Sequence, residues 1–160
     1  MIIMNSAMSK WSYRANANCT KDVIYELIDE IMDKVIEFRG CILYNPSNYT
    51  YTDAMIDRKI AYESDYTGVE ASTNELFYSE LFDRETLEEF VLCLYEQLRR
   101  KFSKDIAVVA SVDGGSCTVR FFSSHAGEAL WFSTEVEKYK EPIIIVVSDS
   151  MMVRRGYRNP

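Results

Sequence analysis

Residues 106–122 read IAVVASVDGGSCTVRFF, and this stretch decides the fold class. Two runs with alternating apolar residues, Ile106–Val112 and Cys117–Phe122, flank the connection Asp113-Gly114-Gly115-Ser116. Glycine adopts the positive φ angles that tight hairpin turns need, so an Asp-Gly-Gly connection between such runs is typical of a β-hairpin. The sequence therefore predicts two consecutive antiparallel strands.

Two segments that precede this hairpin have the periodicity of amphipathic helices. Apolar residues recur every three to four positions over 20–39 and again over 84–102, which is the pattern of a helix with one buried face. Thr20 and Asp83 stand where N-caps belong, because their side-chain oxygens accept hydrogen bonds from the first turn. Gly40 is predicted to end the first helix.

The remaining strands are predicted from short apolar runs. Cys41–Tyr44 and the β-branched run Ile143–Val147 indicate strands. Lys59–Glu63 and Leu130–Phe132 are candidate strands, whereas Leu76–Tyr78 fits either a strand or a helical turn. The Gly and Pro content is low.

Together these elements predict an α+β fold: an antiparallel sheet of about five strands with two main helices on one face. We expect one domain over residues 1–160, because 160 residues is a common size for a single domain. Residues 1–19 and 150–160 are expected to lie at its periphery or to fray.

Acidic residues are concentrated in one segment of the chain. Residues 60–98 hold ten acidic residues and one basic residue, a net charge of −9, whereas the whole chain carries −7. Residues 1–59 contribute −1 and residues 99–160 contribute +3. Charge concentrated in this way attracts a partner of opposite sign, although it also serves solubility alone.

Aromatic residues alternate with these acids, a combination typical of interface hot spots ringed by charge. We therefore predict that the segment binds a basic protein, with tyrosines as anchors and acids that speed association. The predicted partner-binding residues are Tyr62, Tyr66, Glu75, Tyr78, Glu80, Asp83, Glu85, Glu88 and Glu89.

The sequence contains no recognisable catalytic or metal-binding motif. His125 is the only histidine, and its neighbours Ser123 and Ser124 do not by adjacency supply the geometry of a nucleophile and its base. No cysteine pair has the spacing of a zinc site among Cys19, Cys41, Cys93 and Cys117. The sequence thus predicts no catalytic residue, no metal and no cofactor.

Composition argues against several functional classes. The negative charge disfavours direct binding of nucleic acid, whose phosphates require a basic surface. The longest late apolar run, Ile143–Val147, is too short to span a membrane. Met1–Met4 is too short for the apolar core of a secretory signal. With four cysteines read as reduced thiols, we expect a cytoplasmic protein.

Three of these features together resemble small bacterial immunity proteins of contact-dependent or polymorphic toxin systems. They are the helix Thr20–Arg39, the acidic helix start Asp83–Phe90 and the hairpin Val112–Ser116. The resemblance implies a non-enzymatic cytoplasmic inhibitor that binds and neutralises a cognate toxin domain, often a basic nuclease.

Two alternatives stay open from the sequence. An acidic decoy or anti-defence protein of the phage type would spread negative charge around its whole surface, and the net charge of +3 over residues 99–160 counts against it. An enzyme with a dispersed active site is the other alternative. A deep pocket containing His125 beside a buried carboxylate would favour it.

Overall fold

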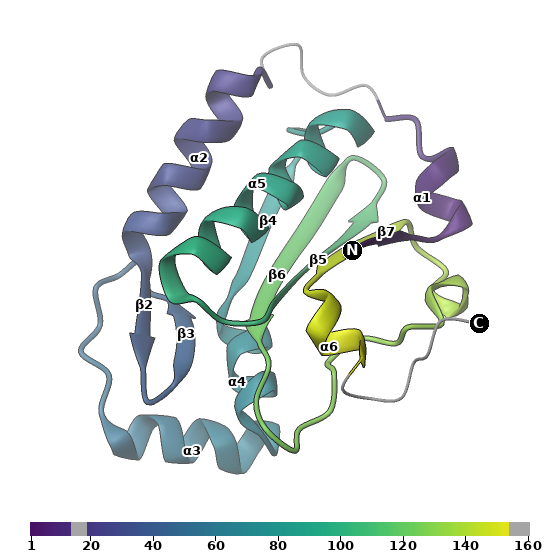
Figure 1. Ribbon diagram of the computed structural model, residues 1–160. Helices are drawn as coiled ribbons and strands as arrows, with labels where there is room; N and C mark the ends of the chain where they lie inside the picture. The colour runs from purple at the N-terminus through teal and green to yellow at the C-terminus, as the bar shows by residue number, and fades with distance from the viewer. Residues whose placement is uncertain (14–18, 154–160) are drawn as a thin grey trace.

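The computed structural model describes residues 1–13 and 19–153, and its centre is an antiparallel sheet of five strands (Figure 1). In spatial order the strands are β1 (Ile2–Met4), β7 (Ile143–Val147), β5 (Ile106–Asp113), β6 (Ser116–Ser123) and β4 (Glu75–Ser79). A separate two-stranded sheet is formed by β2 (Val35–Phe38) and β3 (Cys41–Tyr44). The helices of the described residues are α1 (Ser6–Lys10), α2 (Lys21–Lys34), α3 (Asp53–Glu63), α4 (Tyr66–Thr73), α5 (Arg84–Phe102), the 3₁₀ helix η1 (Val136–Lys138) and α6 (Asp149–Val153).

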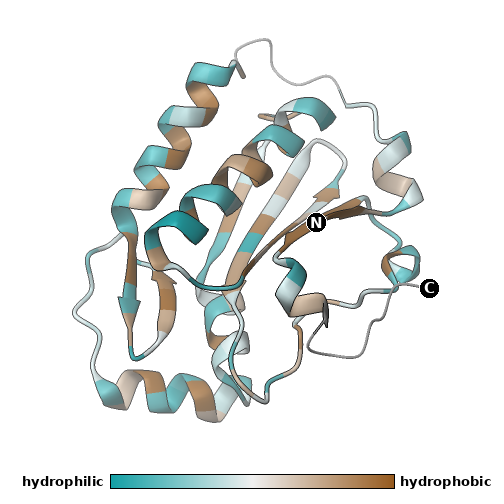
Figure 2. Cartoon of the chain, in the orientation of Figure 1, coloured by the Kyte–Doolittle hydropathy of each residue, from teal (hydrophilic) through white to brown (hydrophobic). Residues whose placement is uncertain are grey.

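The α+β prediction is confirmed. The hairpin β5–β6 pairs Asp113 with Ser116 across Gly114, whose φ of 59° is the conformation that glycine permits. α2 and α5 contact each other and turn their apolar stripes inward, as the alternating colours in Figure 2 show. Thr20 and Asp83 both act as the expected N-caps.

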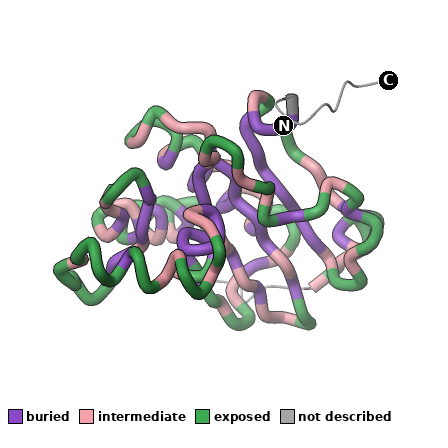
Figure 3. Tube along the Cα trace, turned by 90° about the horizontal axis from the view of Figure 1, so that it is seen from below, coloured by how far each residue is buried: buried purple, intermediate pink, exposed green. Residues whose placement is uncertain are grey.

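The sheet has a core on each face, because successive side chains of a strand point to opposite sides. On the helix side, Val108 and Val119 pack in one cluster with Phe90 of α5. On the other side, Val109 and Ile145 pack in a second cluster, which the segment after β6 and α6 complete. The buried positions therefore run through the centre of the sheet (Figure 3).

The prediction of one helix over 20–39 is wrong in its last turn. α2 ends at Lys34, and residues 35–38 form β2, which pairs with β3 through a two-residue turn. Arg39 and Gly40 both adopt positive φ, 51° and 80°, which is typical of a tight hairpin. Val35 and Ile36 are β-branched and fit a strand, so Gly40 turns the hairpin and does not end the helix.

Three other local predictions also need correction. Lys59–Glu63 is helical and belongs to α3, and Leu130–Phe132 is irregular rather than a strand. Leu76–Tyr78 lies in β4, so the strand alternative holds there. The tail is not peripheral from residue 150, because α6 buries Met151 and Met152. Residues 154–160, with the rest of that prediction, lie outside the described residues.

The first thirteen residues are likewise part of the fold. β1 pairs with β7, and Asn5 is buried where α1 begins. The Asn5 amide donates to the Glu141 carbonyl at 2.8 Å, and its side-chain oxygen accepts from the backbone N–H of Met8 at 2.8 Å. These hydrogen bonds hold the N-terminal segment in place, and the sequence pattern alone does not predict them. Residues 14–18 lie outside the described residues.

None of the helices within residues 1–13 and 19–153 is both long enough and apolar enough to cross a membrane.

Candidate functional site

Helix α4 lies between the small sheet and the main sheet, and its sequence explains how it fits there. Asp65 is its N-cap and accepts from the backbone N–H of Gly68 at 2.6 Å. A Cβ atom on Gly68 would lie 3.0 Å from that aspartate oxygen and 3.1 Å from Glu63, so the absent side chain allows this close turn. Every residue of the helix from Thr67 to Ala71 is buried, including Glu70.

Glu70 is a fully buried carboxylate that joins the two sheets. Its exposed fraction is 0%, and its Oε1 accepts from the backbone N–H of Ile42 in β3 at 2.6 Å. Its Oε2 accepts from the backbone N–H of Ser123 at the end of β6, and the Ser123 hydroxyl also donates to the carboxylate at 2.8 Å. Buried polar groups are stable when their hydrogen bonds are complete, and Glu70 meets this condition.

Asn74 extends the same arrangement one helical turn further on. Its side-chain amide donates to the carbonyls of Ile42 at 2.7 Å and Phe121 at 3.0 Å, and its oxygen accepts from the Tyr44 N–H at 2.6 Å. β4 pairs with β6 only as far as Arg120. Beyond that point, the side chains of Glu70 and Asn74 form the hydrogen bonds with backbone groups of β6 that a neighbouring strand would otherwise form.

His125 completes a cluster that we call the carboxylate centre: Glu70, Ser123 and His125. The His125 Nε2 lies 3.2 Å from Glu70 Oε1 and 3.3 Å from the Ser123 hydroxyl, and its ring stacks on Tyr66 at 5.3 Å between centroids. The side chain is 16% exposed. Both polar contacts use one ring nitrogen, whereas a catalytic triad places the nucleophile and the acid on different nitrogens.

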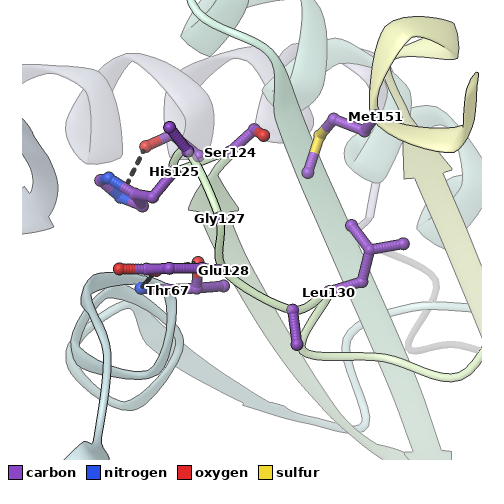
Figure 4. A pocket seen from close by; sticks show the side chains of 10 residues that line it. Thr67, Ser124, His125, Gly127, Glu128, Leu130 and Met151 are labelled. Carbon is purple, nitrogen blue, oxygen red and sulfur yellow. Dashed lines mark hydrogen bonds between the residues drawn. The ribbon is translucent and has the colours of Figure 1, made fainter. Parts of the chain in front are cut away.

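A pocket of about 180 Å³ opens beside His125. Figure 4 shows the segment from Ser124 to Leu130 passing along it, with Thr67 of α4 and Met151 of α6 at its walls. Ser123 also lines the pocket. The pocket is small, and its polar lining residues are Thr67, Ser123, Ser124, His125 and Glu128.

Glu128 binds the N-terminus of α4 at the edge of this pocket. Its carboxylate accepts from the backbone N–H groups of Tyr66 at 3.0 Å and Thr67 at 2.8 Å, and from the Thr67 hydroxyl at 2.7 Å. Burial acts to raise the pKa of Glu128. The three hydrogen bonds, helped by His125, outweigh burial and hold that pKa below its ordinary value.

This shift predicts a pH dependence of stability. A carboxyl with a lowered folded-state pKa stabilises the fold above its unfolded pKa of about 4.3, and this contribution is lost as pH falls through the folded value. In urea denaturation, the wild type should therefore exceed Glu128→Gln in stability at neutral pH, and the two should converge below about pH 4. Thr67→Val removes one hydrogen-bond donor and so brings the folded-state pKa of Glu128 closer to its unfolded value. The stability of this variant should therefore stop falling at a higher pH than that of the wild type, and an unchanged profile would contradict the role of Thr67.

The predicted partner-binding residues do not form one surface. Glu75 and Phe77 point away from the helices, because Leu76 and Tyr78 of the same strand face them. Glu75 forms an ion pair with Arg120. Tyr78 is partly buried against Phe82 and Phe90 in the core, where burial raises its pKa.

The other predicted residues have separate roles. Tyr62 is 86% exposed on α3, whereas Tyr66 stacks on His125. Glu80 is exposed in the turn after β4 with a φ of 55°. Asp83 caps α5 through a capping box with Thr86. Such a cap stabilises a helix by about 1 kcal/mol, so Asp83 has a structural role whatever the protein binds.

Glu85, Glu88 and Glu89 do come together. With Glu96 they border a groove on α5 whose apolar residues are Leu92 and Cys93; we call these six residues the acidic groove. Glu89 forms an ion pair with Lys21 of α2 at 3.1 Å. Tyr25 of α2 is 49% exposed and lies near Cys93.

Comparison with known proteins places the chain in a family. Residues 3–155 match the model of the uncharacterized protein PM0498 family. The chain belongs to this family. No curated protein and no solved structure matches it. The part of the chain that this PM0498 family model covers includes the carboxylate centre, the pocket and the acidic groove.

The sequence pattern predicts neither Glu70 nor Asn74, and it shows His125 only as an isolated histidine. A signal for Glu70 was present, because this glutamate stands between Val69 and Ala71 in a segment of small and apolar residues. Cys41 also lies near the carboxylate centre, where burial, together with the charge of Glu70, raises the pKa of its thiol to about 12. Candidate ligands for a cation are thus Cys41, Glu70 and His125.

Proposed function

We propose that the protein binds a basic segment of another protein in the acidic groove. The observation that carries this proposal is the groove itself, in which four glutamates surround the apolar side chains of Leu92 and Cys93. Glu89 is the one of the four that forms an ion pair among the described residues. Glu85 and Glu88 lie three residues apart on the helix, so their charges repel each other until a cationic partner arrives.

Helix α2 extends the negative surface beside the groove. Four of its exposed acids follow helical spacing and share one face: Asp22, Glu26, Asp29 and Asp33. This surface would speed encounter with a basic partner, while Leu92, Cys93 and the exposed ring of Tyr25 would supply apolar contact.

The charge restricts the class of partner. A negative groove repels nucleic acid and attracts lysine- and arginine-rich protein surfaces. Within this class, the resemblance to immunity proteins supports a basic toxin domain as the partner. The proposed function is then inhibition of that toxin domain by occluding it, and the acidic groove itself catalyses no reaction.

Charge reversal in the groove provides the test. Glu88→Lys combined with Glu96→Lys should slow association with a purified basic partner about tenfold at low salt. The slowing should shrink as salt rises, because exposed charges are screened beyond about 8 Å at physiological ionic strength. Stopped-flow or surface-plasmon measurements of the association rate constant would show both effects.

The matched control changes net charge equally on another part of the surface. Glu135 and Glu141 are exposed in the segment between β6 and β7, and their double replacement by lysine should alter the rate much less. Equal rates for the two double variants would contradict a local contact. The acids of α5 would then serve only solubility.

A second candidate function is catalysis at the pocket. It is favoured by His125, which lines the pocket and contacts the buried carboxylate of Glu70. The Ser123 hydroxyl is buried and bonded to Glu70, so a water molecule, and not this serine, would be the nucleophile that His125 activates. His125→Ala discriminates the two functions: binding in the acidic groove survives this substitution, whereas catalysis does not.

A further inference from the structure

We propose that Cys41, Glu70 and His125 bind a divalent cation of the zinc class. The thiol sulfur, a carboxylate oxygen and an imidazole nitrogen of these residues all lie within 4.8 Å of one another. They come from three separate elements: the first residue of β3, the middle of α4 and the segment that follows β6. This site is independent of the acidic groove.

The ligand set selects the cation. Thiolate, imidazole and carboxylate are the ligands that Zn²⁺ takes, whereas Mg²⁺ and Ca²⁺ require oxygen ligands throughout. In a tetrahedral zinc site the bond lengths of about 2.0–2.3 Å place neighbouring ligand atoms about 3–4 Å apart. Contraction by about 1 Å from the present spacing is within the reach of side-chain rotation at Cys41 and His125.

Glu70 can ligate a cation without losing its bonds to the two sheets. The backbone N–H groups of Ile42 and Ser123 donate to different carboxylate oxygens, and both bonds hold the group in place. The other contacts on Oε1 come from the Ser123 hydroxyl and from His125. A cation would substitute for the proton between His125 and Glu70, so a single hydrogen bond is exchanged for two metal–ligand bonds.

The surroundings also orient the ligands in advance. Ser123 donates its hydroxyl to Glu70, and Tyr66 stacks on the His125 ring. Outer partners of this kind fix ligand geometry in metal sites. Since His125 also lines the pocket, a cation can enter there and a water molecule can complete its coordination.

Charge balance supports the same assignment. Glu70 is fully buried, and among the described residues His125 is the one ionisable side chain within ion-pair distance of it. An uncompensated buried charge is costly, and a divalent cation would neutralise both the carboxylate and a thiolate at Cys41.

Cobalt titration tests the site, because Co²⁺ bound to a thiolate absorbs in the near ultraviolet by charge transfer. Wild-type protein, stripped with a chelator and kept reduced, should bind one Co²⁺ with this band, and Zn²⁺ should displace it. Cys41→Ser should abolish the band, and His125→Ala should weaken cobalt binding at least about tenfold.

Cys117→Ser is the matched control. Cys117 is also buried, and burial raises the pKa of its thiol to about 12, but it lies in β6 away from the three ligands. This variant should retain the band. No band in the wild type, or a band that persists in Cys41→Ser, would overturn the proposal. If Cys41→Ser does not fold, the partly exposed His125→Ala decides the outcome through cobalt affinity.

Discussion

Glu70→Ala should lower the free energy of unfolding by about 3–5 kcal/mol, as removal of one partner from a buried charged network does. The substitution leaves the N–H groups of Ile42 and Ser123 and the Ser123 hydroxyl without their acceptor. An unsatisfied buried donor costs about 1–3 kcal/mol. Urea denaturation in the presence of a chelator measures the loss without any contribution from a bound cation.

Glu70→Gln tests the loss of a hydrogen-bond acceptor while the size of the side chain stays almost unchanged. Each carboxylate oxygen accepts from a backbone N–H, so the amide nitrogen of glutamine would face a donor in either orientation. Glutamine should therefore also destabilise the fold, by more than about 1 kcal/mol. Glu96→Ala, at an exposed position of α5, should change stability by less than about 0.5 kcal/mol. Similar values for Glu70→Ala and Glu96→Ala would show that the carboxylate does not hold the sheets together.

Asn74→Ala should be the next most damaging change. It should lower the free energy of unfolding by about 3 kcal/mol, because one hydrogen-bond donor and two acceptors lose their partner. These groups are the Tyr44 N–H and the carbonyls of Ile42 and Phe121. Ser72→Ala, at an exposed position of the same helix, is the control and should have little effect. Equilibrium unfolding of the single variants provides both values.

The double variant Glu70→Ala/Asn74→Ala should lose less stability than the sum of the two single losses. Both side chains form hydrogen bonds that join α4 to β3 and β6. Removal of one therefore already weakens the packing of α4 to which the other contributes. Strict additivity would mean that the two side chains act independently and that α4 stays in place without either.

The elements that the sequence predicted well are those with local signals. The hairpin β5–β6 has its turn residues between its two strands, and α5 has its cap, its apolar stripe and its basic end within nineteen residues. β2 was missed because Val35 and Ile36 continue the apolar spacing of α2, and periodicity alone does not distinguish the last turn of a helix from a short strand. β1 depends on pairing with a strand far along the chain.

The candidate sites were predicted unevenly for the same reason. Glu85, Glu88 and Glu89 come together because helical spacing places them there, which a sequence shows directly. Cys41, Glu70 and His125 have no characteristic spacing, since three different elements bring them together, and the sequence therefore indicated no metal site. Tyr78 was assigned to a surface because alternation in β4 does not reveal which face is covered.

The pairing of β1 with β7 joins residues 2–4 to residues 144–146. During synthesis on a ribosome, the first of these strands emerges long before its partner exists, and contacts so distant in sequence form late. Until β7 is made, the edge of β5 that β7 covers remains open to other chains. Rapid translation, or a chaperone that shields the β5–β6 hairpin, would thus protect the nascent protein from aggregation through that edge.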